Sequence, residues 1–101
     1  MDLTSKQRAQ LRGLANTLDT ILTVGKEGIS ENTIQQATAA LEARELMKCK
    51  ALETCPLSSR EAAESLAAST RSEVVQVIGT KFVLYRPSHT KEKALRIVLV
   101  K

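Results

Sequence analysis

Residues 20–52 read TILTVGKEGISENTIQQATAALEARELMKCKAL, a stretch that changes from β-branched residues to a helical pattern and back again. The run TILTV ends at Gly25 and predicts a strand, which we expect to be buried on both faces because Ile21 and its apolar neighbours do not alternate with polar residues. Ser30 is a favourable N-cap, and apolar residues at helical spacing predict a helix over residues 31–43. A second strand follows in ELMKCKAL. A strand, helix and strand in this order form a right-handed crossover between parallel strands.

The second strand of this unit places lysines on one face of the sheet. Side chains alternate along a strand, so Lys48 and Lys50 point to the same side as Leu46 and away from Met47 and Cys49. We therefore expect one sheet face to be cationic and the other to be apolar.

The segment before this unit predicts a helix over residues 5–16. Thr4 and Gln7 have the spacing of a capping box. The expected buried stripe of this helix consists of Leu11, Leu14, Ala15 and Leu18.

The remaining surface of this first helix is basic. Lys6, Arg8 and Arg12 lie off the leucine stripe and should project into solvent. Such residues form either an ordinary solvated helix face or part of a cationic binding surface.

The segment after the unit predicts a helix and a hairpin. Ser58 and Glu61 form a second capping box, which starts a helix that ends near Thr70. The runs EVVQVIG and KFVLYRP are so closely spaced around Gly79 and Thr80 that a tight hairpin is the natural connection.

The predicted fold is α/β, with a small mixed four-stranded sheet packed against three helices in the order α-β-α-β-α-β-β. Two crossovers should each give parallel neighbouring strands, and the hairpin should add an antiparallel strand. We expect one domain over residues 1–88 and a basic and apolar C-terminal tail over residues 89–101. The tail either adds an edge strand or has no fixed structure.

Composition excludes several functional classes. The chain has 101 residues, 43% hydrophobic and 26% charged, as expected for one folded domain. Its net charge of +4 favours a polyanionic partner. The only aromatic residues are Phe82 and Tyr85, which should point to opposite faces, one in the core and one partly exposed. A reader that stacks several bases on aromatic rings is therefore excluded, although Tyr85 could be a single stacking platform.

Several other observations bear on chemistry and location. Cys49, Cys55 and His89 match neither zinc spacing nor a disulfide framework. No apolar run is long enough to span a membrane, and no signal peptide is recognisable, so we expect a cytoplasmic protein with no membrane partner.

Enzymatic function is not expected. His89 has no nucleophile or carboxylate partner suggested by the sequence. The GKEG segment lacks the Gly-Lys-Ser/Thr of a Walker loop and the third glycine of a dinucleotide fingerprint. We predict no catalytic residue, no cofactor and no metal.

The GKEG segment, residues 25–28, has two interpretations. Glycines after a strand often only permit a turn. Glycines without a Cβ also allow close approach of a nucleic-acid backbone, while the following helix N-terminus and Lys26 favour an anion. The basic residues expected nearby, on the first helix and the second strand, favour the binding interpretation.

The motifs LTSKQRAQLRGLANTL, VGKEGIS, ALEARELMKCK and VVQVIGTKFVLYRPS, in this order, resemble the small bacterial YhbY-like proteins, which consist of a single CRM (chloroplast RNA splicing and ribosome maturation) domain. The resemblance covers the chain from about Leu3 to Ser88. It implies a fold similar to the C-terminal domain of translation initiation factor three, with an added N-terminal helix. It also implies RNA binding and association with precursors of the large ribosomal subunit.

The resemblance places the family's GxxG loop on residues 25–28 and its last strand motif on residues 83–87. Glu27 departs from what a phosphate site favours, and it either weakens the loop contact or turns toward the helix start. The candidate RNA-binding residues are Gly25, Lys26, Glu27, Gly28, Lys6, Arg8, Arg12, Lys48, Lys50 and Arg86.

The leading expectation is therefore a monomeric, non-catalytic protein that binds ribosomal RNA or large-subunit precursors during ribosome assembly. Arg86 has a structural alternative, capping the sheet edge. The functional alternative is a protein-interaction adaptor that docks an acidic partner on its basic face and pairs its C-terminal strand with another sheet.

Overall fold

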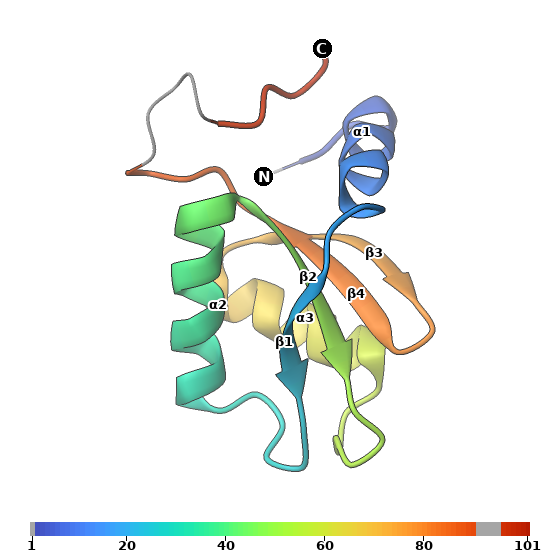
Figure 1. Cartoon of the computed structure of the whole chain (residues 1–101), viewed down its shortest axis with the longest axis vertical. Coiled ribbons are helices and arrows are strands. Elements are labelled where there is room, and N and C mark those ends of the chain that lie inside the picture. The colour runs from blue at the N-terminus through green and yellow to red at the C-terminus, as the bar shows by residue number, and fades with distance from the viewer. Residues whose placement is uncertain (1, 91–95) are drawn as a thin grey trace.

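The computed structural model describes residues 2–90 and 96–101 and has the expected order of elements (Figure 1). The elements are α1 (Ser5–Ala15), β1 (Thr20–Val24), α2 (Glu31–Arg44), β2 (Leu46–Ala51), α3 (Ser59–Thr70), β3 (Glu73–Ile78) and β4 (Lys81–Tyr85). Within the described residues, every helix is too short or too polar to cross a bilayer.

The helix caps and the hairpin turn have the structures that the sequence predicted. Both capping boxes are present, with Gln7 N donating to Thr4 Oγ1 at 3.1 Å and Glu61 N donating to Ser58 Oγ at 3.1 Å. The turn between β3 and β4 contains Gly79 at a φ of +58°, a conformation that glycine adopts without strain.

The sheet has the strand order β1-β2-β4-β3. β1 and β2 are parallel neighbours, and β4 is antiparallel to both β2 and β3. The expectation that the second crossover also gives parallel neighbours is wrong, because β4 lies between β2 and β3. Four of the five residues of β4 are buried, so this strand occupies the sheet interior, and β3, with only one buried residue, takes the edge.

The sheet separates two apolar clusters, since α1 covers one face and α2 with α3 covers the other (Figure 1). Phe82 lies in the cluster under α2 and α3, and Tyr85 lies in the cluster under α1. The expectation that one of these rings is partly exposed is wrong, because helices cover both sheet faces where they lie. Tyr85 is only 2% exposed, so it offers no platform for stacking a base.

Two apolar residues expected in the core lie at the surface. Leu14 is 45% exposed and Ile21 is 39% exposed. α1 covers only part of its sheet face, so Leu14 extends past the sheet residues that bury Leu11 and Ala15. β1 is an edge strand with an irregular register between Thr20 and Leu22, so it is buried on one face rather than two.

The C-terminal residues 96–101 lie against α1 without forming a strand. Gln10 Nε2 donates to Val98 O at 2.8 Å, and Gln7 Nε2 donates to Val100 O at 2.9 Å. Ile97 and Leu99 pack on the apolar cluster under α1. This described part of the tail follows neither of the two expectations, an edge strand or no fixed structure. Residues 91–95 of that prediction lie outside the described residues.

Candidate nucleic-acid interface

The GKEG segment forms a tight turn between β1 and α2. Gly28 N donates to Gly25 O at 3.0 Å, and Gly28 has a φ of +66°. A Cβ on Gly28 would lie 3.5 Å from Pro56 Cγ, and Gly28 is buried. The turn therefore requires Gly28 for its conformation. Gly28 packs against the body of the protein, and its remaining surface lines the hollow beside the loop.

The two residues at the tip of the turn face solvent. Lys26 and Glu27 are exposed, and Gly25 is half-buried. A Cβ on Gly25 would meet only ordinary contacts, 3.7 Å from Leu52 Cδ1 and 3.9 Å from Thr54 Oγ1. The most exposed part of the loop is therefore its tip, Lys26 and Glu27.

A shallow hollow of about 280 Å³ lies between this loop and the first turns of α2. Lys26 and Glu27 line it from the loop, and Ser30 and Asn32 line it from the helix. Ser30 caps α2, accepting a hydrogen bond from Thr33 N at 3.2 Å. The first amides of a helix lack intrahelical partners and favour an anion, so the hollow can accept a phosphate next to Lys26.

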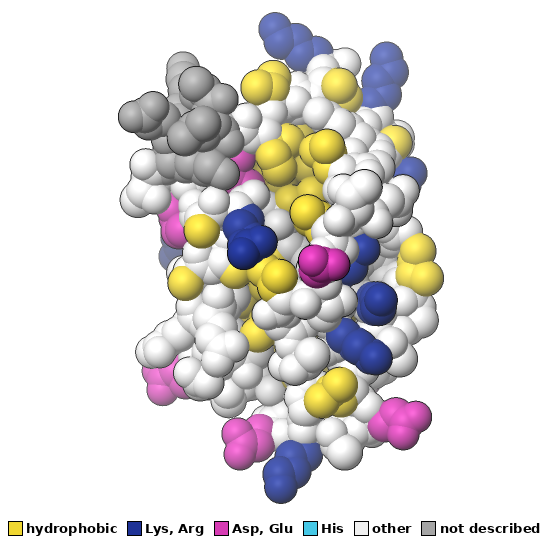
Figure 2. Space-filling model, in the orientation of Figure 1, with side chains coloured by type: hydrophobic (Ala, Val, Ile, Leu, Met, Phe, Trp, Pro, Cys, Tyr) yellow, Lys and Arg dark blue, Asp and Glu magenta, His cyan; other side chains and the backbone are white. Residues whose placement is uncertain are grey.

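Lysines gather on the sheet face that α1 leaves open, as expected for Lys48 and Lys50. Lys50 lies directly opposite Lys81 in the antiparallel pair of β2 and β4, and Lys48 lies two residues earlier on the same face. Figure 2 shows dark-blue side chains gathered over this part of the sheet. We call Lys48, Lys50 and Lys81 the lysine cluster. Sequence reasoning missed Lys81, because the predicted strand order placed β3 beside β2, whereas β4 pairs with β2 in the structure.

The lysine cluster is close to the GKEG loop, whereas α1 is not. Thr23, two residues before Gly25, pairs with Lys50. Figure 1 shows α1 at the opposite end of the molecule's long axis from the loop that joins β1 to α2. The expectation that the basic face of the first helix adjoins the loop is therefore wrong. The lysine cluster lies on the sheet between these two regions.

The three basic residues of α1 differ in their surroundings. Lys6 and Arg12 are exposed. The Arg8 guanidinium donates to Val74 O at 2.6 Å and lies 3.8 Å from a carboxylate oxygen of Glu73. Arg8 therefore joins α1 to β3, and only part of its side chain faces solvent.

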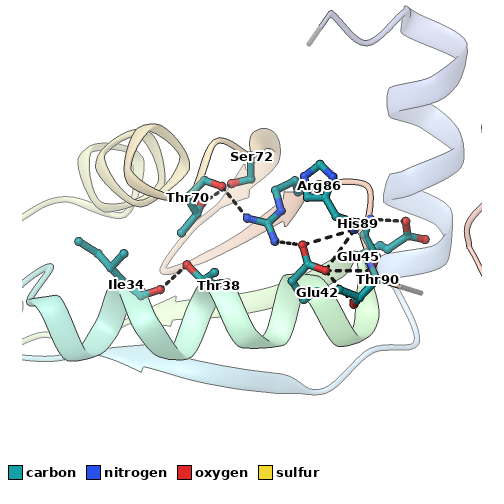
Figure 3. A network of polar contacts seen from close by, with 10 residues as sticks. Ile34, Thr38, Glu42, Glu45, Thr70, Ser72, Arg86, His89 and Thr90 are labelled. Atoms are coloured by element: carbon teal, nitrogen blue, oxygen red, sulfur yellow. Dashed lines mark hydrogen bonds and ion pairs between the residues drawn. The ribbon is translucent and has the colours of Figure 1, made fainter. Parts of the chain in front are cut away.

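Arg86 lies in an internal polar network (Figure 3). Its guanidinium donates to Glu42 Oε1 at 2.5 Å and to Thr70 O at 3.0 Å, and its side chain is 12% exposed. This arrangement joins the end of β4 to α2 and α3. Arg86 is separated from the lysine cluster and does not contribute to an open cationic surface.

Glu42 and Glu45 extend this network to the residues after β4. Glu42 accepts hydrogen bonds from Ser88 Oγ and His89 N, both at 3.1 Å, and Glu45 accepts from Ser88 N at 2.7 Å. Burial would raise the pKa of Glu42, but its hydrogen bonds and the charge of Arg86 outweigh that effect and lower it. Among the described residues, His89 takes part through its backbone N–H.

The described residues contain no group of three or more histidine, cysteine or acidic side chains that could hold a metal ion. Cys49 is fully buried, and burial raises its pKa to about 12, which keeps the thiol protonated. Within the described residues, neither a metal ion nor this thiol is therefore expected to take part in binding.

Known proteins similar to this chain share most of its length. "Probable RNA-binding protein YqeI" of Bacillus subtilis (strain 168) is 45% identical over 85% of this chain and 90% of its own. "Probable RNA-binding protein MJ0652" of Methanocaldococcus jannaschii is 38% identical over 92% of this chain and 70% of its own. The solution structure of hypothetical protein SAV1595 from Staphylococcus aureus superimposes with a TM-score of 0.74 at 46% identity, covering 91% of this chain and 94% of that one.

The family comparison agrees with these relatives. Residues 3–86 match the CRS1 / YhbY (CRM) domain. All three helices and all four strands of the described structure lie within this match, and the C-terminal tail lies outside it. The chain belongs to the CRS1 / YhbY (CRM) domain family.

Proposed function

We propose that this protein binds RNA through phosphate contacts made by the lysine cluster and the tip of the GKEG loop. The observation that carries the proposal is the direct opposition of Lys50 and Lys81 on an open sheet face. Like charges directly opposite each other in a sheet are destabilising, and a bound phosphate removes that repulsion. The names of the relatives as RNA-binding proteins support RNA as the polyanion.

The surface is suited to structured RNA rather than to a sequence read base by base. Phosphate contacts position a protein on nucleic acid but carry little sequence information. Lys26, next to the hollow at the start of α2, would hold one phosphate, while the lysine cluster would hold others along the sheet. Lys6 and Arg12 would add contacts only for an RNA long enough to reach α1.

The expected location, oligomeric state, lack of catalysis and ribosomal partner belong to the same proposal. The protein acts as a cytoplasmic monomer, performs no covalent chemistry, and associates with precursors of the large ribosomal subunit. Family membership and the names of the relatives support the RNA partner in this proposal. The adaptor alternative lacks a specific observation in its favour, since residues 96–101 are engaged by α1 of the same chain.

RNA binding is tested by a salt titration of the affinity for a structured ribosomal RNA fragment. We expect log K to fall linearly with log salt concentration, because each phosphate contact releases counterions. A loop variant that replaces Lys26 and Glu27 with aspartates should bind more weakly and still fold. An affinity insensitive to salt contradicts the multi-phosphate interface, and unchanged affinity of the loop variant removes the loop from it.

The ribosomal partner is tested separately by sedimentation of the tagged protein through a ribosome gradient. We expect co-sedimentation with precursors of the large subunit and not with mature particles. Retention of the association after nuclease treatment would instead support a protein partner.

A further inference from the structure

An apolar groove lies beside the lysine cluster, on the same side of the molecule. Leu14 of α1, Ile21 of β1 and Ile97 of the C-terminal segment line it, and its volume is about 630 Å³. This volume lies within the range of about 300–1,000 Å³ that is typical of small-molecule sites. Figure 2 shows exposed hydrophobic side chains in the middle of this face, with charged side chains beside them.

Charged side chains on the groove make it suitable for a nucleotide rather than for a purely apolar ligand. Among the described residues, Arg44 and Lys48 line the groove, and Asp19 contributes a carboxylate. Lys48 also lines the neighbouring hollow that contains Lys81. An RNA strand whose phosphates follow the lysine cluster therefore reaches the groove without leaving the cationic surface.

We propose that this groove binds an unpaired nucleobase of the RNA, with its faces on Leu14 and Ile21 and its phosphate near Lys48 and Arg44. The inference rests on the proposed RNA-binding function and adds a second kind of contact to it. RNA recognition commonly uses unstacked bases, whose faces are apolar and whose edges form hydrogen bonds. Aliphatic side chains here take the place of the aromatic rings that this chain lacks at its surface.

Asp19 gives the groove a preference among bases. A carboxylate only accepts hydrogen bonds, so it favours a base edge that carries an exocyclic amino group and disfavours a carbonyl oxygen. At ring position 4 cytosine presents an amino group where uracil presents a carbonyl, so the preference applies to a base held with this position toward Asp19 rather than with the N3–H of uracil toward it. The groove therefore prefers cytosine to uracil, two bases of nearly the same size.

The experiment compares single-stranded oligocytidylate, oligouridylate and a duplex RNA of equal length by fluorescence anisotropy. The test variant is L14Q/I21T, which keeps a helix former in α1 and a β-branched residue in β1. Its control is V98T, a similar change from an aliphatic residue to threonine, at a residue that is 80% exposed and lines neither the groove nor the hollow beside it.

We expect L14Q/I21T to bind oligocytidylate about 5- to 20-fold more weakly, because apolar contact with the base is lost. Its duplex affinity and the salt dependence of its binding should stay at the wild-type values, and V98T should match the wild type throughout. D19N should reduce the preference for oligocytidylate over oligouridylate.

Different failures have different meanings. Wild-type affinity of L14Q/I21T for oligocytidylate, with normal salt dependence, overturns the base-binding groove and leaves the phosphate interface intact. Equal losses on oligocytidylate and duplex RNA also overturn it. Absence of salt-dependent RNA binding by the wild type overturns the proposed function itself, and a protein captured by the groove without RNA identifies a different occupant.

Discussion

At the scale of single residues, Arg86 belongs to the last strand motif of the family, at residues 83–87, but its side chain stabilises the fold instead of facing a ligand. Its guanidinium contacts Glu42 and the carbonyl of Thr70, which lie 44 and 16 residues away in the sequence. Its Nε is buried and has no hydrogen-bond partner among the described residues. These distant partners could not be read from the local pattern YRPS, which is why sequence reasoning offered both phosphate binding and a structural cap.

R86Q should therefore lower the free energy of unfolding by about 1–3 kcal/mol, because it removes hydrogen bonds from a side chain that is only 12% exposed and that joins β4 to α2 and α3. Urea denaturation followed by circular dichroism measures the change. R12Q, on an exposed part of α1, is the control and should leave stability unchanged. Unchanged stability of R86Q together with a loss of RNA affinity would assign Arg86 to the interface instead.

Glu42 predicts a pH dependence of stability. Its pKa is lowered in the folded protein, so its contribution is present above its unfolded pKa and is lost as pH falls through the folded value. The wild type should lose more stability than E42Q when pH falls below about 4. Denaturation midpoints at about pH 7 and about pH 3 test this linkage. A constant difference between the two proteins would show that the carboxylate charge is not involved.

At the scale of elements, the pairing of β2 with β4 creates the lysine cluster. Alternation in ELMKCKAL correctly predicted that Lys48 and Lys50 share a face. The position of Lys81 depends on the insertion of β4 between β2 and β3, which crossover rules alone did not predict. The cluster is therefore a product of strand order as well as of the local pattern.

K81Q should stabilise the protein by about 0.2–1 kcal/mol and weaken RNA binding, because it removes a like charge directly opposite Lys50. K26Q is the control, since Lys26 lies in the loop and faces no cross-strand lysine. It should weaken RNA binding without raising stability. Chemical denaturation and anisotropy titrations on the same preparations compare the two effects. A less stable K81Q would contradict the repulsion on which the proposed interface rests.

The described C-terminal segment leads to a prediction about domain boundaries. We propose that residues 1–88 form the domain and that the tail is an addition to it. A chain ending at Ser88 should fold but lose about 2–4 kcal/mol of unfolding free energy, because Ile97 and Leu99 no longer cover the cluster under α1. V98A, at a residue 80% exposed, should have no effect. An unfolded shortened chain would place the tail within the domain.

At the scale of the whole molecule, the sequence predicted elements better than their arrangement. Caps and turns act over a few residues, so the capping box at Thr4 and the hairpin turn at Gly79 could be recognised directly. The distance of α1 from the GKEG loop depends on which sheet face and which end α1 covers. Nothing in the helix's own pattern determines that choice. The interface accordingly centres on the sheet rather than on the first helix.

The positions of the lysines predict which regions of the surface an RNA of a given length contacts. The lysine cluster lies between the loop at one end of the molecule and α1 at the other (Figures 1 and 2). A long structured RNA could contact all three regions, whereas a short one would be held mainly by the cluster. The number of phosphates neutralised by the cluster is therefore the central quantity.

The most direct measurement is the salt dependence of RNA affinity for the wild type and for K48Q/K50Q/K81Q. Each phosphate contact contributes about 0.7–0.9 to the slope of log K against log salt concentration, so the variant's slope should be shallower by about 2–3. Circular dichroism would confirm that the variant remains folded. A shallower slope with weaker binding is the predicted result, and a slope equal to that of the wild type would contradict the proposed interface.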